Sequence, residues 1–270
     1  MTFYQNMENS KSQKHFVLVH GACHGAWCWY KVKPLLESSG HRVTALNMAA
    51  SGIDMTAIQD VHTIEEYTKP LLEFLEKLPK NNEKVIVVGH SLGGFNLAVA
   101  MEKFPEKIDV AVFLTAFMPD IDHRPSFILD QFDERTPTET WLDTQFAPYS
   151  SSLQHLTTIF FGPKVTASKF YQLSPVEDRE LAKALLRPSS FFVYDLSKAK
   201  NFSTKGYGSV KRVYILCGED KIITEEFQRW MIENHPVEEV IKIDDADHMA
   251  MFSKPKELGH RLLEIADKYA

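Results

Sequence analysis

A serine, an aspartate and a histidine in this chain each lie a few residues past the end of an apolar segment. Ser91 is the centre of residues 89–93, Gly-His-Ser-Leu-Gly, which lie after the apolar run 85–88 and before a segment with helical periodicity. The Gly-x-Ser-x-Gly pattern is typical of a sharp strand-to-helix turn that exposes the serine hydroxyl at a sheet edge. Serine is a poor nucleophile at neutral pH, so we expect His248 to accept its proton and Asp220 to orient the imidazole.

Apolar runs and helical periodicity alternate along the chain around these residues. Strands are expected at residues 15–19, 42–46, 85–88, 108–115, 211–217 and 239–243, and helices at residues 27–39, 64–78, 92–104, 224–234 and 254–269. The alternation predicts an α/β fold with a mostly parallel sheet covered by helices on both faces, because parallel neighbours need crossover connections. Ser91, Asp220 and His248 then share the carboxyl edge of the sheet, in the chain order of the α/β hydrolases.

Three other carboxylates compete with Asp220 as the partner of the histidine. Asp245 and Asp247 are nearer to His248 in the sequence, but a neighbour one position away directs its side chain elsewhere. We therefore expect both to be solvated turn residues. Glu219 precedes Asp220 and could take its place.

The first predicted strand ends in a loop of small residues, 20–25. Backbone N–H groups in such a loop can bind the negative charge that develops on an ester carbonyl oxygen, and Ala22 is the candidate donor. Four potential zinc ligands lie in or next to this loop: His20, Cys23, His24 and Cys28. Their spacing matches no usual zinc site and no second Cys/His pair follows, so we predict neither a metal nor another cofactor.

The composition excludes several classes of partner. The net charge is −6 and basic residues are scattered among acidic ones, so no nucleic-acid partner is expected. Hydrophobic residues make up 44% of the chain, but no run approaches the ~18 apolar residues that a membrane span needs. The three cysteines, an odd number in apolar surroundings, suit reduced thiols in a cytoplasmic protein.

The alternation of strands and helices stops between residues 118 and 205. Residues 118–202 contain 13 of the 31 aromatic residues and several prolines, which favours an insertion packed over a site. We expect residues 1–13 to form a flexible leader, residues 14–117 and 206–270 the hydrolase core, and residues 118–205 a mainly helical cap.

Sequence motifs spread over the chain from about residue 14 onward resemble the plant methylesterase and hydroxynitrile lyase family, most of all its salicylate-binding methyl esterases. They occupy residues 15–27, 33–37, 49–52, 89–94, 134–137, 141–146, 207–214 and 246–251. The resemblance implies the α/β-hydrolase fold, a Ser91, Asp220 and His248 triad and an oxyanion hole formed by the N–H groups of Ala22 and Leu92. One departure is Asn47-Met48, where relatives usually carry Asp-Leu.

The resemblance also implies a substrate pocket. Its predicted residues are Gly21, Phe117, Phe132, Trp141, Phe146, Ile159 and Met249. By analogy with the family, a homodimer is expected. The expected partners are a small ester and its product acid, without nucleic acid or membrane.

These observations predict a cytoplasmic carboxylesterase for methyl esters of small hydrophobic plant acids, such as methyl salicylate, methyl jasmonate or methyl indole-acetate, and a role in plant hormone metabolism and defence. Three alternatives remain: a hydroxynitrile lyase, a receptor that only binds a small acid, and a methylesterase of a larger alkaloid or pigment ester. Gly21 and Met249 favour the esterase over the lyase, since neither can hold a cyanohydrin oxygen or stabilise departing cyanide.

Overall fold

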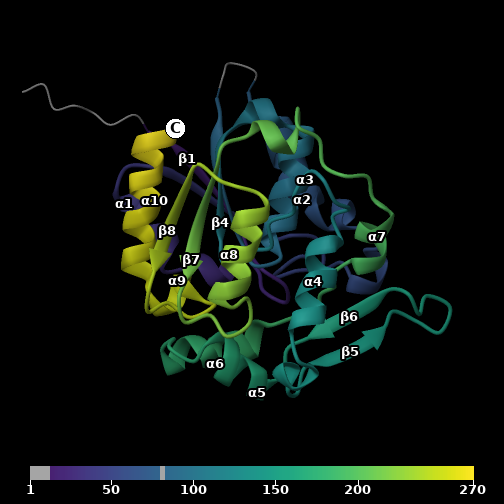
Figure 1. Cartoon of the computed structure of the whole chain (residues 1–270). Helices are drawn as coiled ribbons and strands as arrows, with labels where there is room; N and C mark the ends of the chain where they lie inside the picture. Colours follow the sequence, from purple (N-terminus) through teal and green to yellow (C-terminus); the bar gives the residue numbers. More distant parts are fainter. Residues whose placement is uncertain (1–12, 80–82) are drawn as a thin grey trace, which may run out of the picture.

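A six-stranded parallel sheet forms the centre of the molecule (Figure 1). The computed structural model describes residues 13–79 and 83–270, so residues 1–12 of the predicted leader lie outside the described part. The sheet has the order β2-β1-β3-β4-β7-β8, and all neighbours pair in parallel, which confirms the predicted fold class. Its strands are β1 (His15–Val19), β2 (Arg42–Leu46), β3 (Val85–His90), β4 (Ile108–Leu114), β7 (Arg212–Cys217) and β8 (Glu239–Ile243).

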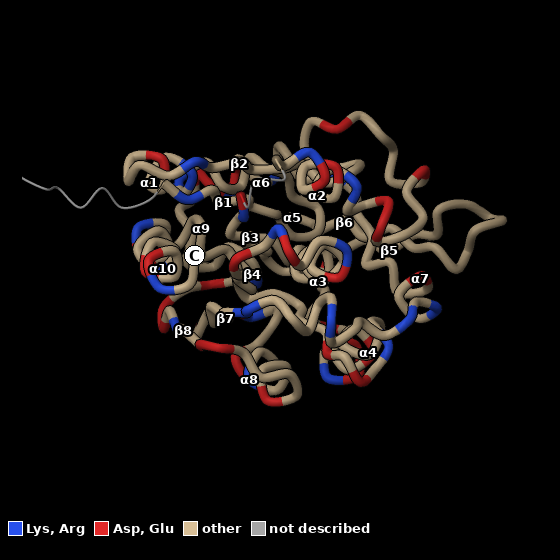
Figure 2. Tube along the Cα trace, turned by 90° about the horizontal axis from the view of Figure 1, so that it is seen from above, with Lys and Arg blue, Asp and Glu red and all other residues tan. Residues whose placement is uncertain are grey.

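Helices cover both faces of this sheet. On one side lie α1 (Val32–Ser38) and α10 (Pro255–Tyr269), and on the other lie α2 (Ile64–Lys77), α3 (Gly93–Lys103) and α8 (Glu225–Asn234), as the view from above shows (Figure 2). The short helix α9 (Ala250–Ser253) follows β8 and precedes α10. Neighbouring parallel strands can be joined only by a crossover connection, and these helices form the crossovers.

Local sequence explains where two of the helices begin. The helix predicted over residues 27–39 is wrong in part, because the chain forms a 3₁₀ turn, Ala26–Trp29, and starts α1 two residues before Pro34. Proline has no N–H to donate, so a helix tolerates it in the first turn, where N–H groups have no intrahelical acceptor. Helix α2 begins with a capping box: Thr63 Oγ1 accepts the N–H of Glu66, whose carboxylate accepts the N–H of Thr63.

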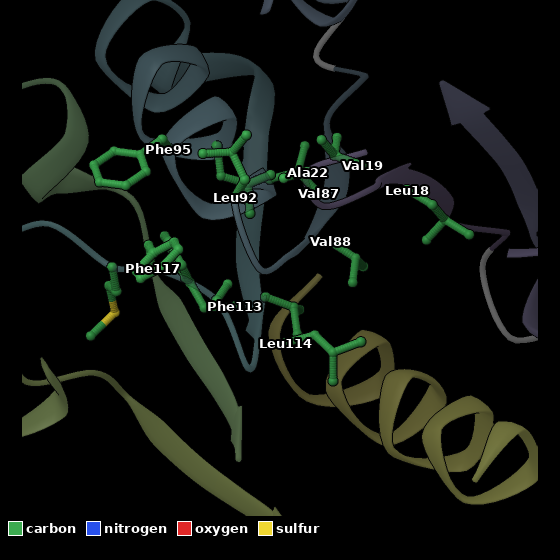
Figure 3. Packing of buried hydrophobic residues seen from close by; sticks show 14 of the residues in the cluster. Leu18, Val19, Ala22, Val87, Val88, Leu92, Phe95, Phe113, Leu114 and Phe117 are labelled. Atoms are coloured by element: carbon green, nitrogen blue, oxygen red, sulfur yellow. The ribbon is translucent and has the colours of Figure 1, made fainter. Parts of the chain in front are cut away.

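The two central strands are buried almost completely. Every residue of β3 is buried, as are all residues of β4 except Asp109. Figure 3 shows side chains of β1, β3 and β4 packed in the core, with Leu92 and Phe95 beside them. A fully buried Val, Leu or Phe contributes about 1.5–3 kcal/mol, so the carboxyl ends of these strands are held firmly. Ser91 directly follows β3, so the packing of this strand also restricts the motion of the Ser91 backbone.

Residues 118–205, which we call the cap, contain helices and a small sheet. The helices are α4 (Phe127–Arg135), α5 (Pro163–Val165), α6 (Val176–Leu185) and α7 (Val193–Lys198). The strands β5 (Gln145–Pro148) and β6 (Thr157–Phe160) form an antiparallel hairpin, which the prediction of a mainly helical cap did not include. All residues of β5 are exposed, so it lacks the alternation of apolar and polar residues that identifies a strand. The cap lies over one end of the sheet (Figure 1).

The surface carries both signs of charge. Lysine and arginine residues alternate with aspartate and glutamate along the trace, without a large region of one sign (Figure 2). Within residues 13–79 and 83–270, no helix has the length and apolar character needed to span a membrane.

Candidate active site

Ser91 occupies a strained turn between β3 and α3. Its φ is +54°, in the left-handed region that residues other than glycine rarely adopt. The turn brings strand and helix so close that a Cβ at Gly89 would lie 2.8 Å from the carbonyl oxygen of Gly93. Helix α3 begins two residues after Ser91, so its positive N-terminal end lies next to the serine. The side chain is 7% exposed.

Asp220 and His248 form a buried pair, as the sequence predicts. His248 Nδ1 lies 2.6 Å from Asp220 Oδ2, and both side chains are at most 1% exposed. The second carboxylate oxygen, Oδ1, accepts the N–H groups of Ile222 and Ile223 at 2.7 and 3.0 Å. Glu219 is exposed, so it does not replace Asp220 in this arrangement.

The contact with Asp220 leaves the other ring nitrogen of His248 available. Since an ionised carboxylate only accepts, Nδ1 carries the hydrogen and Nε2 holds a lone pair. Nε2 is buried and has no hydrogen-bond partner among the described residues. The ring of His248 lies 4.6 Å from that of His90, which precedes Ser91, and His90 Nε2 lies 2.8 Å from the carbonyl oxygen of His248. This arrangement suits a base that takes the proton of Ser91.

The loop after β1 and the start of α3 each bring one backbone N–H group to the same edge of the sheet. Within the described part of the chain, the N–H groups of Ala22 and Leu92 have no hydrogen-bond acceptor. Ala22 belongs to this loop, and Leu92 follows Ser91 at the start of α3. Two such free amides are what an oxyanion hole requires.

The residues that could have been zinc ligands instead hold this loop in place. His20 Nδ1 bonds to Gly21 O at 2.8 Å while its Nε2 accepts the N–H of Met48 at 3.0 Å. His24 Nδ1 lies 2.8 Å from the carbonyl oxygen of Ala22, and its Nε2 lies 2.6 Å from the hydroxyl of Tyr171 in the cap. Burial lowers the pKa of His20 to about 4 and that of His24 to about 3, so both rings are neutral near pH 7.

A cavity of about 310 Å³ lies in the cap. It is lined by four of the predicted pocket residues and by twelve others: Phe132, Trp141, Phe146 and Ile159, with Leu129, Asp130, Asp133, His155, Leu156, Thr157, Thr158, Ser190, Phe191, Phe192, Val193 and Tyr194. The other three predicted residues, Gly21, Phe117 and Met249, are not part of its lining.

Two contacts join residues of the cavity wall to the serine turn and to the loop after β1. The ring of Phe117, whose N–H donates to the carbonyl oxygen of Ser91, lies 5.1 Å from the ring of Phe132. On the other side, Cys23 Sγ donates to the carbonyl oxygen of Ile159 at 3.3 Å, and Cys23 follows Ala22. Two residues of the cavity wall, Phe132 and Ile159, therefore contact residues next to the serine turn and the loop after β1, whereas Ser91, His248 and Ala22 do not line the cavity.

The cap also covers the histidine through residues that the sequence did not indicate. The ring of Phe170 stands edge-on to that of His248 at 5.1 Å, and Phe170 is 3% exposed. Because an isolated aromatic residue in a segment without periodicity carries no positional signal, sequence reasoning missed Phe170.

The expectation that Asp247 is a solvated turn residue is wrong. Its side chain is fully buried and accepts the N–H of Leu173 and the hydroxyl of Ser174, each at 2.9 Å. Burial raises the pKa of this carboxyl group. Asp247 thus fastens the cap next to His248, whereas Asp245 is exposed and pairs with Lys254, as expected for a turn residue.

Comparison with known proteins shows which family shares this sequence and fold. The alpha/beta hydrolase family matches residues 16–260. Methylesterase 1 of Arabidopsis thaliana is 60% identical over 97% of this chain and 100% of its own length. Salicylic acid-binding protein 2 of Nicotiana tabacum is 61% identical over 96% of this chain and 99% of its own. The crystal structure of polyneuridine aldehyde esterase covers 94% of this chain and all of its own with a TM-score of 0.92, at 49% identity.

These matches extend over nearly the full length of both chains, so the relatives share the core, the serine turn and the cap with this chain. The chain belongs to the alpha/beta hydrolase family and, within it, to the plant methylesterases.

Proposed function

We propose that this chain hydrolyses methyl esters of small hydrophobic acids through an acyl-enzyme formed on Ser91. The observation that carries the proposal is the buried His248–Asp220 pair, 2.6 Å apart, at the same sheet edge as a serine in a left-handed turn. Membership of the plant methylesterases supports ester hydrolysis as the reaction. The chain is a carboxylic ester hydrolase.

The reaction follows from the positions of these groups. Ser91 Oγ attacks the ester carbonyl carbon while its proton passes to His248 Nε2, and Asp220 stabilises the resulting imidazolium. The carbonyl oxygen becomes negative and accepts hydrogen bonds from the N–H groups of Ala22 and Leu92. His248 then protonates the methoxy oxygen, the carbon–oxygen bond breaks, and methanol leaves the acyl group on Ser91. Water activated by His248 releases the acid and restores the serine.

The cavity indicates the class of acid. Its walls include the rings of Phe132, Trp141 and Phe146, which suit a flat apolar group. One relative is named for binding salicylic acid. Methyl salicylate is therefore the first candidate substrate, ahead of methyl jasmonate and methyl indole-acetate.

The nucleophile is tested with Ser91→Ala. We expect it to lose hydrolysis of a methyl-ester panel by at least about a hundredfold while the oxyanion donors remain, because the attacking group is gone. Acid release from each ester is measured by chromatography, and circular dichroism checks the fold. Ser38→Ala, which changes an exposed hydroxyl, is the matched control.

Two results would contradict this function. If Ser91→Ala retained more than about a hundredth of the wild-type activity, Ser91 would not be the nucleophile. If the wild type rapidly released cyanide from mandelonitrile and hydrolysed no ester, the result would favour a hydroxynitrile lyase over an esterase.

A second candidate is a larger ester that carries a protonated amine. Asp130 and Asp133 line the cavity beside its aromatic walls, and polyneuridine aldehyde esterase shares the fold at 49% identity. The ester panel therefore includes an aminoalkyl methyl ester and a neutral ester of equal size. A clear preference for the amine would favour this candidate over the salicylate type.

We further propose that the enzyme works in the cytoplasm as a homodimer, without metal, cofactor, membrane or nucleic acid. The three cysteines are buried free thiols, which suits a reducing compartment. The interspersed surface charges give no phosphate-binding face (Figure 2). The homodimer rests on the family resemblance.

A further inference from the structure

The segment that follows β4 joins the serine turn to the carboxylate. Leu114 O accepts the N–H of Ser91 at 3.4 Å, and the N–H of Phe117 donates to Ser91 O at 3.1 Å. Between these two contacts, Thr115 Oγ1 donates to Asp220 Oδ2 at 2.5 Å. One short segment therefore bonds both to the backbone of the serine and to the side chain of the aspartate.

Thr115 is held in a conformation that β-branched residues rarely adopt. Its φ is +37°, its side chain is fully buried, and its N–H donates to the carbonyl oxygen of Ile215 on β7 at 2.8 Å. Such a conformation costs free energy and persists only where the surroundings impose it, often at functional sites. The strain alone assigns no role, but the contact of the hydroxyl group with Asp220 does.

All hydrogen-bonding directions of the Asp220 carboxylate are in use. Oδ1 accepts two backbone N–H groups, from Ile222 and Ile223, and Oδ2 is shared between Thr115 Oγ1 and His248 Nδ1. We propose that Thr115 is a positioning residue that fixes the rotation of the Asp220 carboxylate so that one lone pair of Oδ2 points at Nδ1 of His248. This inference rests on the proposed function, because it takes His248 to be the base.

The shared oxygen also sets how strongly the imidazolium is held. A hydrogen bond from Thr115 takes part of the negative charge of Oδ2, so that oxygen attracts the protonated His248 less strongly. Without the hydroxyl group, the imidazolium is held more tightly and gives up its proton to the departing methoxy group more slowly. The carboxylate also loses one of the four hydrogen bonds that fix its rotation. Both effects act on the chemical step and not on ester binding, since Thr115 does not line the cavity.

Other titratable groups surround the Asp220–His248 pair, from the loop after β1, from β3 and β7, and from the turn before the histidine. They are His24, His90, Tyr214, Cys217 and Asp247. Burial lowers the pKa of both histidines and raises that of the tyrosine and the cysteine, so these four are uncharged near neutral pH. Asp247 is the remaining acid, and it is unchanged in the Thr115 and Thr68 variants that test this inference.

The test compares Thr115→Val and Thr115→Ser with the wild type. Valine keeps the shape and the branching but removes the donor, while serine keeps the donor. For Thr115→Val we expect kcat to fall about tenfold, KM to stay within about twofold, and the acid limb of the kcat/KM profile to move to higher pH. For Thr115→Ser we expect values within about twofold of the wild type.

Thr68→Val is the matched control, because Thr68 is also fully buried and its hydroxyl donates to Ile64 O at 2.6 Å within α2. It should lower the melting temperature without moving the pH profile. The role of Thr115 is refuted if Thr115→Val keeps both the wild-type kcat and its profile. It is equally refuted if Thr115→Ser is as impaired as the valine variant, since the lost donor would then not be the cause.

The failure of this inference can be told apart from the failure of the proposed function. If Ser91→Ala is inactive and Thr115→Val behaves like the wild type, only the role of Thr115 falls. If Ser91→Ala remains active, the proposed mechanism itself falls, whatever Thr115→Val does.

Discussion

At the scale of single residues, Gly21 leaves open the space that the serine turn occupies. A Cβ at Gly21 would lie 2.8 Å from Ser91 Cβ and 2.9 Å from His90 Nδ1, closer than such atoms approach one another. The sequence resemblance assigns Gly21 to the substrate pocket. The structure adds a second role, because the missing side chain allows the loop after β1 to pack directly against the serine.

This packing predicts the effect of Gly21→Ala. The added methyl group must displace Ser91 or His90, and a displacement of about 1 Å at a reacting group costs on the order of a hundredfold in rate. We therefore expect kcat/KM for the best ester to fall by about a hundredfold. Gly259→Ala in α10 is the control, since its Cβ would meet Leu35 at an ordinary 3.4 Å. Equal activity of both variants would show that the turn accommodates the methyl group.

Among the elements, the cap is fastened to the turn that carries His248 by buried polar contacts. Asp247 uses both carboxylate oxygens: Oδ2 accepts from Leu173 and Ser174, and Oδ1 accepts the N–H of Met249 at 3.0 Å. The segment that it holds directly follows Phe170, which covers the ring of His248. The position of this cap segment therefore depends on a carboxylate that directly precedes His248 in the sequence.

Asp247→Asn should loosen this part of the cap. An amide offers only one oxygen, so at least one of the three donors loses its acceptor, at a cost of roughly 1–3 kcal/mol. We expect faster hydrogen exchange in residues 166–174 and a lower kcat/KM. Asp245→Asn is the matched control, because this exposed residue and its pair with Lys254 contribute little to stability. Unchanged exchange in Asp247→Asn would mean that other contacts hold the segment.

At the scale of the whole molecule, folding buries neutral histidines that would be protonated in the unfolded chain. Burial lowers the pKa of His20 from 6.5 to about 4. The unfolded chain therefore binds more protons than the folded chain between these two values, and the free energy of unfolding falls as the pH is lowered through this window. His20 alone accounts for roughly 3 kcal/mol of this loss.

His20→Asn should make the stability of the protein less sensitive to acid. The amide nitrogen of asparagine can replace Nδ1 as a donor to Gly21 O, and it does not titrate, although it leaves the N–H of Met48 without its acceptor. We expect lower stability at pH 7 but a flatter decline between pH 6.5 and 4, measured by urea unfolding. The exposed His260 gives the control variant, His260→Asn. A slope equal to that of the wild type would show that His20 titrates normally in the folded protein.

Local sequence patterns are enough to predict the order of the elements and the three residues of the proposed triad. Apolar runs that end shortly before Ser91, Asp220 and His248 predict parallel strands, and parallel strands bring their carboxyl ends to one edge. The boundaries of β1, β2 and β8 match the predicted ranges, because a polar or charged residue directly follows each strand: His20, Asn47 and Asp244. Periodicity carries this information because it depends only on neighbouring residues.

Tertiary structure alone decided the contacts between segments that are distant in sequence. Thr115 reads as the last residue of an apolar strand, yet its hydroxyl group lies 2.5 Å from Asp220, more than a hundred residues away. Asp247 reads as an exposed turn residue, yet the cap buries it, and the hairpin β5–β6 carries no alternation that would reveal it. The physical reason is the same in each case: burial and partner choice depend on which surfaces meet after folding, and no local pattern records them.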